Sequence, residues 1–180
     1  MQIARASPSR LTRNASRWRT VSVALFAFML LAGIGQAQAA ADCSITAVSL
    51  NFGVYDPAVT SADDSVGTVT VTCRNISGGA DRISYTVMLS NGQYGTSAAT
   101  RAMGAGANRL GYNVFTDPAR TQAWGTGTGG TVIASGAMTV GPGNGNNVKT
   151  VVHSVYGRIP QLQDAAPGTY SDTMVVTLTF

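Results

Sequence analysis

A strict alternation of apolar and polar residues, repeated in short runs, constrains the fold of this chain more than any other feature. The clearest run covers residues 168–180, where only Asp172 interrupts the apolar parity. The residues of that parity are Tyr170, Met174, Val176, Leu178 and Phe180. A period of two is typical of a β-strand with one buried and one solvent-facing side. We therefore predict one long strand over this run, with these five side chains on its inner face.

The same alternation recurs earlier, with turn residues between the runs. Residues 67–73, 82–90 and 108–117 each place apolar side chains at every second position. Residues 131–140 are expected to form two short strands around Gly136. No run has the apolar spacing and the capping residues of a helix. Short strands separated by turns predict an all-β, antiparallel β-sandwich.

The N-terminal residues have the composition of a secretory signal peptide. Five arginines and no acid lie in residues 1–20, and an uncharged apolar stretch follows over residues 21–34. Small residues then offer cleavage after Ala39 or Ala41. We predict a signal peptide over residues 1–41 and one exported domain over residues 42–180. The alternative is an uncleaved N-terminal anchor.

Removing this segment changes the charge of the protein. Of the twelve basic residues, seven remain against eight acidic ones, so the basic balance of the whole chain belongs to the signal peptide. The remaining charges are scattered, which argues against nucleic acid as a partner. No other stretch resembles a membrane segment, so no membrane association is expected after cleavage.

Two cysteines, Cys43 and Cys73, fall in the predicted exported domain. A pair of cysteines in an exported chain usually forms a disulfide, and this is the pairing we predict. The alternatives are two free thiols or part of a metal site. A zinc site would need four ligands, and His153 is the only histidine.

The sequence lacks the residue constellations of an enzyme. His153 has no nucleophile motif to serve, and the glycine loop over residues 125–130 lacks the Gly-Lys-Ser/Thr ending of a phosphate loop. We predict no catalytic residue, no cofactor and no metal. Trp124, just before this loop, leaves two readings open. Its ring stacks on a sugar, or it fills the core.

Five patches in a fixed order resemble one known family. They are LNFGVYDP after the first cysteine, GTVTVTC, LGYNVFTDPARTQAWGTG, VYGRIP and the final GTYSDTMVVTLTF. Together they resemble the spore coat protein U domain family, which includes the subunits of archaic chaperone–usher pili. The resemblance covers nearly all of residues 42–180.

The resemblance implies an immunoglobulin-like sandwich that lacks its last strand. Cys43 and Cys73 would correspond to the family's disulfide, and Tyr170, Met174, Val176, Leu178 and Phe180 would border the resulting groove. A periplasmic chaperone would lend the missing strand, an usher would export the subunit, and a neighbouring subunit would then donate its own strand. The expected location is the periplasm, then the cell surface, a pilus or the extracellular space.

The short segment ahead of Cys43 sets an expectation about the role. Cleavage leaves one to three residues there, too few for a donor strand. The chain is therefore expected to accept a strand without giving one, as a pilus tip, a minor subunit or a coat protein. The alternative function is a self-complete, adhesin-like or lectin-like module that binds through loops around Trp124.

Overall fold

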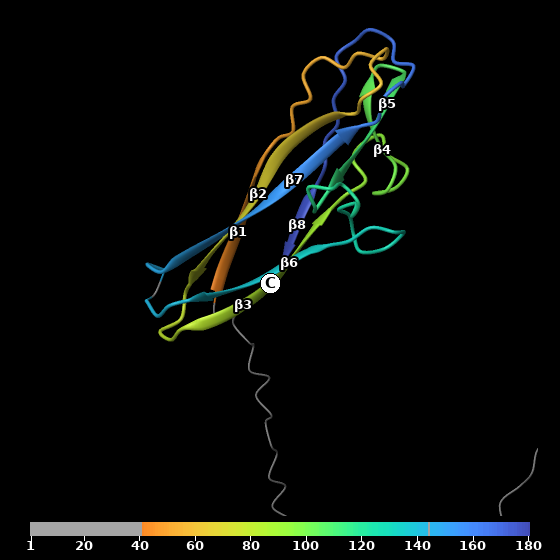
Figure 1. Ribbon diagram of the computed structural model, residues 1–180. Coiled ribbons are helices and arrows are strands. Elements are labelled where there is room, and N and C mark those ends of the chain that lie inside the picture. The colour runs from red at the N-terminus through yellow and green to blue at the C-terminus, as the bar shows by residue number, and fades with distance from the viewer. Residues whose placement is uncertain (1–40, 144) are drawn as a thin grey trace, which may run out of the picture. The chain divides into compact units, whose positions relative to one another are not determined.

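The computed structural model describes residues 41–143 and 145–180, and all regular structure in these ranges is β-strand (Figure 1). The eight strands are β1 (Ala41–Val48), β2 (Asp63–Asn75), β3 (Asp81–Leu89), β4 (Arg101–Ala105), β5 (Asn108–Phe115), β6 (Ala134–Val140), β7 (Val148–Ile159) and β8 (Val176–Thr179). The described part of the chain contains no helix long and apolar enough to cross a membrane.

The strands form two sheets in which every pair is antiparallel. A five-stranded sheet has the order β1-β2-β7-β5-β4, and a three-stranded sheet has the order β6-β3-β8. One edge of the larger sheet is β1, and one edge of the smaller sheet is β8 (Figure 1). The prediction of an all-β, antiparallel β-sandwich is confirmed.

The core lies where the alternation of the sequence predicts it. In β2 the buried side chains include Val69, Val71 and Cys73, and the threonines between them stay partly exposed. Strands β3 and β5 follow the same rule; their buried side chains are Ile83, Tyr85, Val87, Leu89, Leu110, Tyr112 and Val114. The parity of each run thus decides which side chains exclude water.

Trp124 fills the core, with 0% of its surface exposed. Its indole Nε1–H donates a hydrogen bond of 2.9 Å to the carbonyl oxygen of Val87 in β3. A ring that stacks on a sugar must reach solvent, so the sugar-stacking reading of Trp124 is wrong. The adhesin-like alternative therefore cannot use the Trp124 ring to contact a ligand.

Trp124→Phe tests this role. We expect the free energy of unfolding to fall by about 2–4 kcal/mol, because the smaller ring leaves a cavity and the Val87 carbonyl loses its donor. Urea unfolding followed by circular dichroism measures the change. Phe180→Leu is the control, because Phe180 is half-exposed. A loss for Trp124→Phe no larger than for the control would contradict the role.

Two expected strand boundaries are wrong. Residues 134–140 form one continuous strand, β6, and do not break at Gly136. A side chain at this position would collide with the phenol of Tyr85, so glycine makes room for a core ring without ending the strand.

The long strand expected over residues 168–180 is also shorter than predicted. Regular pairing is limited to Val176–Thr179, with one isolated bridge between Ser171 and Gly104 of β4. Ser171 pairs with the larger sheet and β8 pairs with the smaller one, so the segment crosses between the sheets. The alternation of exposure persists through the crossing, which is why the pattern suggested one strand.

Candidate functional site: a groove beside an edge strand

A groove of about 970 Å³ lies beside the crossing segment, and we call it the edge groove. One wall is the end of β1 and the chain that follows it, and the other wall is residues 165–174 with the first residue of β8. Side chains from β5 and β7 also line it. The apolar lining includes Leu50, Phe52, Met103, Leu110, Val155, Ile159, Tyr170, Met174 and Val176.

The wall after β1 depends on glycine in β7. A side chain at Gly157 would lie 2.7 Å from the Cζ atom of Phe52 and 3.0 Å from the Cδ1 atom of Leu50. The absence of a side chain there lets both residues pack on the sandwich. Phe52 then meets the ring of Tyr112 edge to face, with 6.2 Å between the ring centroids.

Strand β8 has an open edge within the described sandwich. It pairs with β3 alone, and the Val175 carbonyl accepts a hydrogen bond of 3.0 Å from the Ser90 amide at the end of β3. Peptide groups in an antiparallel strand alternate in direction, so those of Val176 and Leu178 point toward the other side. This edge can accept a further strand.

The five residues predicted to border a groove separate into three groups. Tyr170, Met174 and Val176 line the edge groove. Leu178 packs against the core but is not among the lining residues. Phe180 is 52% exposed and lies outside both sets, so its position at the groove stays a prediction. Strand β8 ends at Thr179, and no strand pairing orients Phe180.

The sequence analysis did not predict that the residues after β1 form a wall of the groove. Leu50 and Phe52 share one parity beyond Val48, where β1 ends, and this is the only signal in the sequence for them. Their position over Gly157 comes from contacts between segments far apart in the chain. A pattern of neighbouring residues cannot predict such contacts.

Asp172 is the one charged side chain among the residues that line the edge groove. Its Oδ1 accepts hydrogen bonds from the amides of Gln93 (2.7 Å) and Thr173 (2.9 Å), and its Oδ2 accepts one from the phenol of Tyr112 (2.8 Å). Burial raises the pKa of Tyr112, as does the bond to Asp172, so the phenol stays a neutral donor. Gly92, at φ 82°, leaves the space that this carboxylate occupies.

Arg101 of β4 lies in the core and holds the C-terminal end of β3, next to the edge groove. It is 2% exposed, and its guanidinium donates to the carbonyls of Leu89, Ser90, Ala98 and Trp124 and to the side chain of Asn113. Burial lowers the pKa of Arg101, whereas Tyr112 and Asp172 act in the opposite direction. Since Leu89 pairs with Val176, Arg101 anchors the strand end that positions β8.

The disulfide between Cys43 and Cys73 is present in the structure. The two residues face each other in the β1–β2 ladder, and Cys73 is fully buried. The bond holds the edge strand β1 to β2, its neighbour in the described sheet, and β1 leads directly into the groove wall at Leu50.

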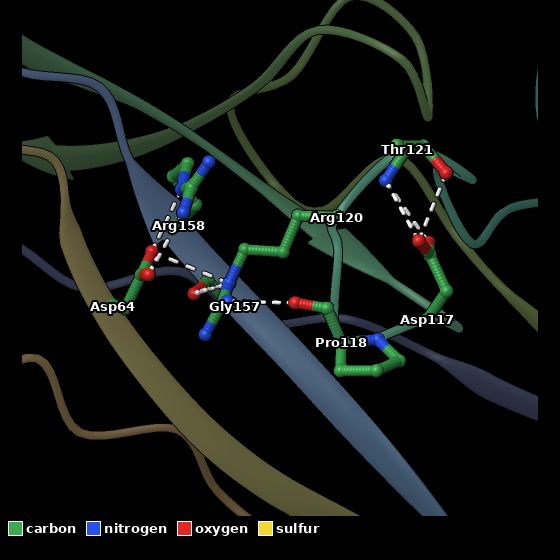
Figure 2. A network of polar contacts seen from close by, with 7 residues as sticks. All are labelled: Asp64, Asp117, Pro118, Arg120, Thr121, Gly157 and Arg158. Atoms are coloured by element: carbon green, nitrogen blue, oxygen red, sulfur yellow. Dashed lines mark hydrogen bonds and ion pairs between the residues drawn. The ribbon is translucent and has the colours of Figure 1, made fainter.

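A polar network holds the loop after β5 against β7 (Figure 2). Asp64 accepts two hydrogen bonds from Arg158, of 2.7 and 2.8 Å, and Arg120 lies 3.2 Å from the same carboxylate. Arg120 also donates to the carbonyl of Gly157. The hydrogen bond from Arg158 lowers the pKa of Asp64. These contacts join the loop to the strand that carries the glycine beneath Phe52.

His153 is partly buried and packs against the core. Its Nε2 forms a hydrogen bond of 2.9 Å with the phenol of Tyr85, and its ring packs edge to face on Trp124. Burial lowers the pKa of His153, which favours the neutral ring. Among residues 41–143 and 145–180, no three His, Cys, Asp or Glu side chains are grouped as a metal site would require.

The predicted signal peptide lies outside the described residues, apart from Ala41. Ala41 is the first residue of β1, it is buried, and it pairs with Asn75. Of the two expected cleavage sites, only the one after Ala39 keeps this residue in the strand.

Three comparisons relate the chain to known proteins. The family model of the Spore Coat Protein U domain matches residues 29–177. Protein U of Myxococcus xanthus is 31% identical over 144 residues, which are 73% of this chain and 72% of that protein. In the solved structures, a chain of the CsuC–CsuE chaperone–tip adhesion subunit pre-assembly complex, from the archaic chaperone-usher Csu pili of Acinetobacter baumannii, is 22% identical with a TM-score of 0.49. That match covers 78% of this chain and 40% of the other.

Proposed function

The chain belongs to the spore coat protein U domain family, and on this premise we propose that it is a structural subunit of a surface coat or of a chaperone–usher-type pilus. It accepts a strand from a second chain in the edge groove. The observation that supports this proposal is the open edge of β8 next to an apolar groove of about 970 Å³.

The physical basis is β-strand addition. The peptide groups on the open edge of β8 offer hydrogen bonds to an extended segment, and alternate side chains of that segment enter the groove. Burial of those side chains, together with Met174, Val176 and Phe52, supplies the affinity. In this proposal the sandwich lacks its last strand until a partner provides it.

The proposed partners act in sequence. A periplasmic chaperone fills the groove after export, an usher secretes the subunit, and a neighbouring subunit then donates its strand. The protein would thus pass from the periplasm to the cell surface, a pilus or the extracellular space. This role requires no catalysis.

A matched pair of isosteric substitutions tests the proposal. Val176 lines the groove, whereas its neighbour Val175 is 64% exposed. In Val176→Thr, water hydrates the added hydroxyl while the groove is open. A strand that fills the groove displaces this water, and the loss of hydration weakens binding. We expect about a tenfold loss of affinity for a strand-lending chaperone, and no loss for Val175→Thr.

The measurement is the dissociation constant of the chaperone complex for the exported protein, with circular dichroism as the check on folding. Equal affinities for the two variants would exclude the edge groove as the binding site. A chain that unfolds cooperatively as a stable monomer and binds no strand would exclude strand acceptance altogether.

A further inference from the structure

The edge groove contains one charged position. Asp172 stands between Tyr170 and Met174 on the same parity, and it is the residue that interrupts the alternation of the sequence. A groove that holds apolar side chains explains Tyr170 and Met174 but does not by itself require a carboxylate between them.

The hydrogen bonds of Asp172 leave one acceptor position open. A carboxylate offers about four lone-pair positions, and the amides of Gln93 and Thr173 and the phenol of Tyr112 occupy three of them. Both bonds from amides end on Oδ1, so the open position is on Oδ2. The phenol oxygen of Tyr112, which donates to the same Oδ2, also keeps an acceptor position of its own.

A buried cation, Arg101, interacts with this carboxylate at a distance. Arg101 interacts electrostatically with Asp172, but its five N–H groups are directed at four backbone carbonyls and the side chain of Asn113. None of the ion pairs in the described sandwich joins the two residues. Arg101 is therefore a cation near Asp172 that does not fill its open acceptor position.

A strand that enters the groove removes water from this acceptor. An apolar side chain opposite Asp172 would leave a desolvated lone pair without a donor, which is unfavourable. A lysine or arginine would bring a second cation close to Arg101. A hydroxyl group supplies one neutral donor and occupies the volume of a methyl group.

We propose that the strand accepted by the edge groove carries a serine or threonine at the one inward position that meets Asp172, and apolar side chains at its other inward positions. Asp172 thereby sets the register of the incoming strand. This inference rests on the proposed function, because it requires a strand in the groove.

Threonine and valine have nearly the same shape, which allows a direct test with peptides. The parent probe is a nine-residue peptide with valine at its four inward positions. Four further peptides each replace one of these valines with threonine. Their dissociation constants are measured with the protein purified after export from the full-length sequence. We expect three threonine peptides to bind about tenfold more weakly and one to bind as well as the parent or better.

The variant Asp172→Ala should remove this preference, so that the favoured threonine also binds about tenfold more weakly than valine. Asp164→Ala is the matched control, because Asp164 is an exposed aspartate just before the groove wall and does not line the groove. The preference should persist in that variant.

Nuclear magnetic resonance of the unaltered protein gives a second readout that does not depend on the folding of a variant. The amide signals of Gln93 and Thr173, which both donate to Asp172, should shift more with the favoured threonine peptide than with the valine parent. Equal weakening by all four threonines, or a preference that survives Asp172→Ala, would overturn the role of Asp172 and leave strand acceptance intact. If no peptide of the set binds, strand acceptance fails, and this inference fails with it.

Discussion

Replacing Arg101 with methionine is expected to lower the free energy of unfolding by about 4 kcal/mol or more. The guanidinium is buried and donates to four backbone carbonyls and to Asn113. Methionine fills a similar volume but donates nothing, so these acceptors stay buried without partners. Backbone carbonyls cannot be removed by mutation, and this makes the loss larger than the usual cost of breaking one ion pair.

Arg101→Lys should recover part of the loss, because an ammonium has three donors where the guanidinium has five. The matched control is Arg109→Met on the adjacent strand, where the side chain lies on the surface over the ring of Tyr94. A change below about 1 kcal/mol is expected there. Urea unfolding with the disulfide intact measures all three variants. Equal stability of Arg101→Met and Arg109→Met would show that the buried carbonyls do not depend on Arg101 for their hydrogen bonds, and would contradict this role.

The second large effect concerns the disulfide. Cys43→Ala combined with Cys73→Ala should lower the free energy of unfolding by about 3–4 kcal/mol, the chain-entropy value for a loop of this length. The cysteines are separated by 30 residues and join the edge strand β1 to β2. Release of β1 should also loosen Leu50 and Phe52, so affinity for a strand in the edge groove should fall together with stability.

Ser44→Ala combined with Thr72→Ala provides the comparison. These two residues are the next cross-strand pair of the same ladder and face away from the core. Their removal should cost less than about 1 kcal/mol. Reduction of the unaltered protein by dithiothreitol should reproduce the loss seen for the cysteine variant. A loss below 1 kcal/mol in both experiments would show that the β1–β2 ladder holds without the bond.

The sequence alone determined that the chain forms short strands, and for β2, β3 and β5 it determined which side is buried. Period-two alternation is a property of neighbouring residues, and in β2, β3 and β5 the buried parity is the one that the pattern predicts. The pairing of Cys43 with Cys73 was equally accessible, because the sequence contains only two cysteines. The resemblance to the spore coat protein U domain family, carried by five ordered patches, gave the family.

Only the tertiary structure decided the character of the groove. Trp124 and Arg101 are buried by segments distant in the chain, and the partners of Asp172 come from a turn after β3 and from β5. The shortening of the last strand to β8 has the same origin, since Ser171 pairs with β4 and not with the neighbours of β8. Local patterns specify which way a side chain points from its own strand. Which groups it meets there depends on how distant strands come together, and no local pattern contains that information.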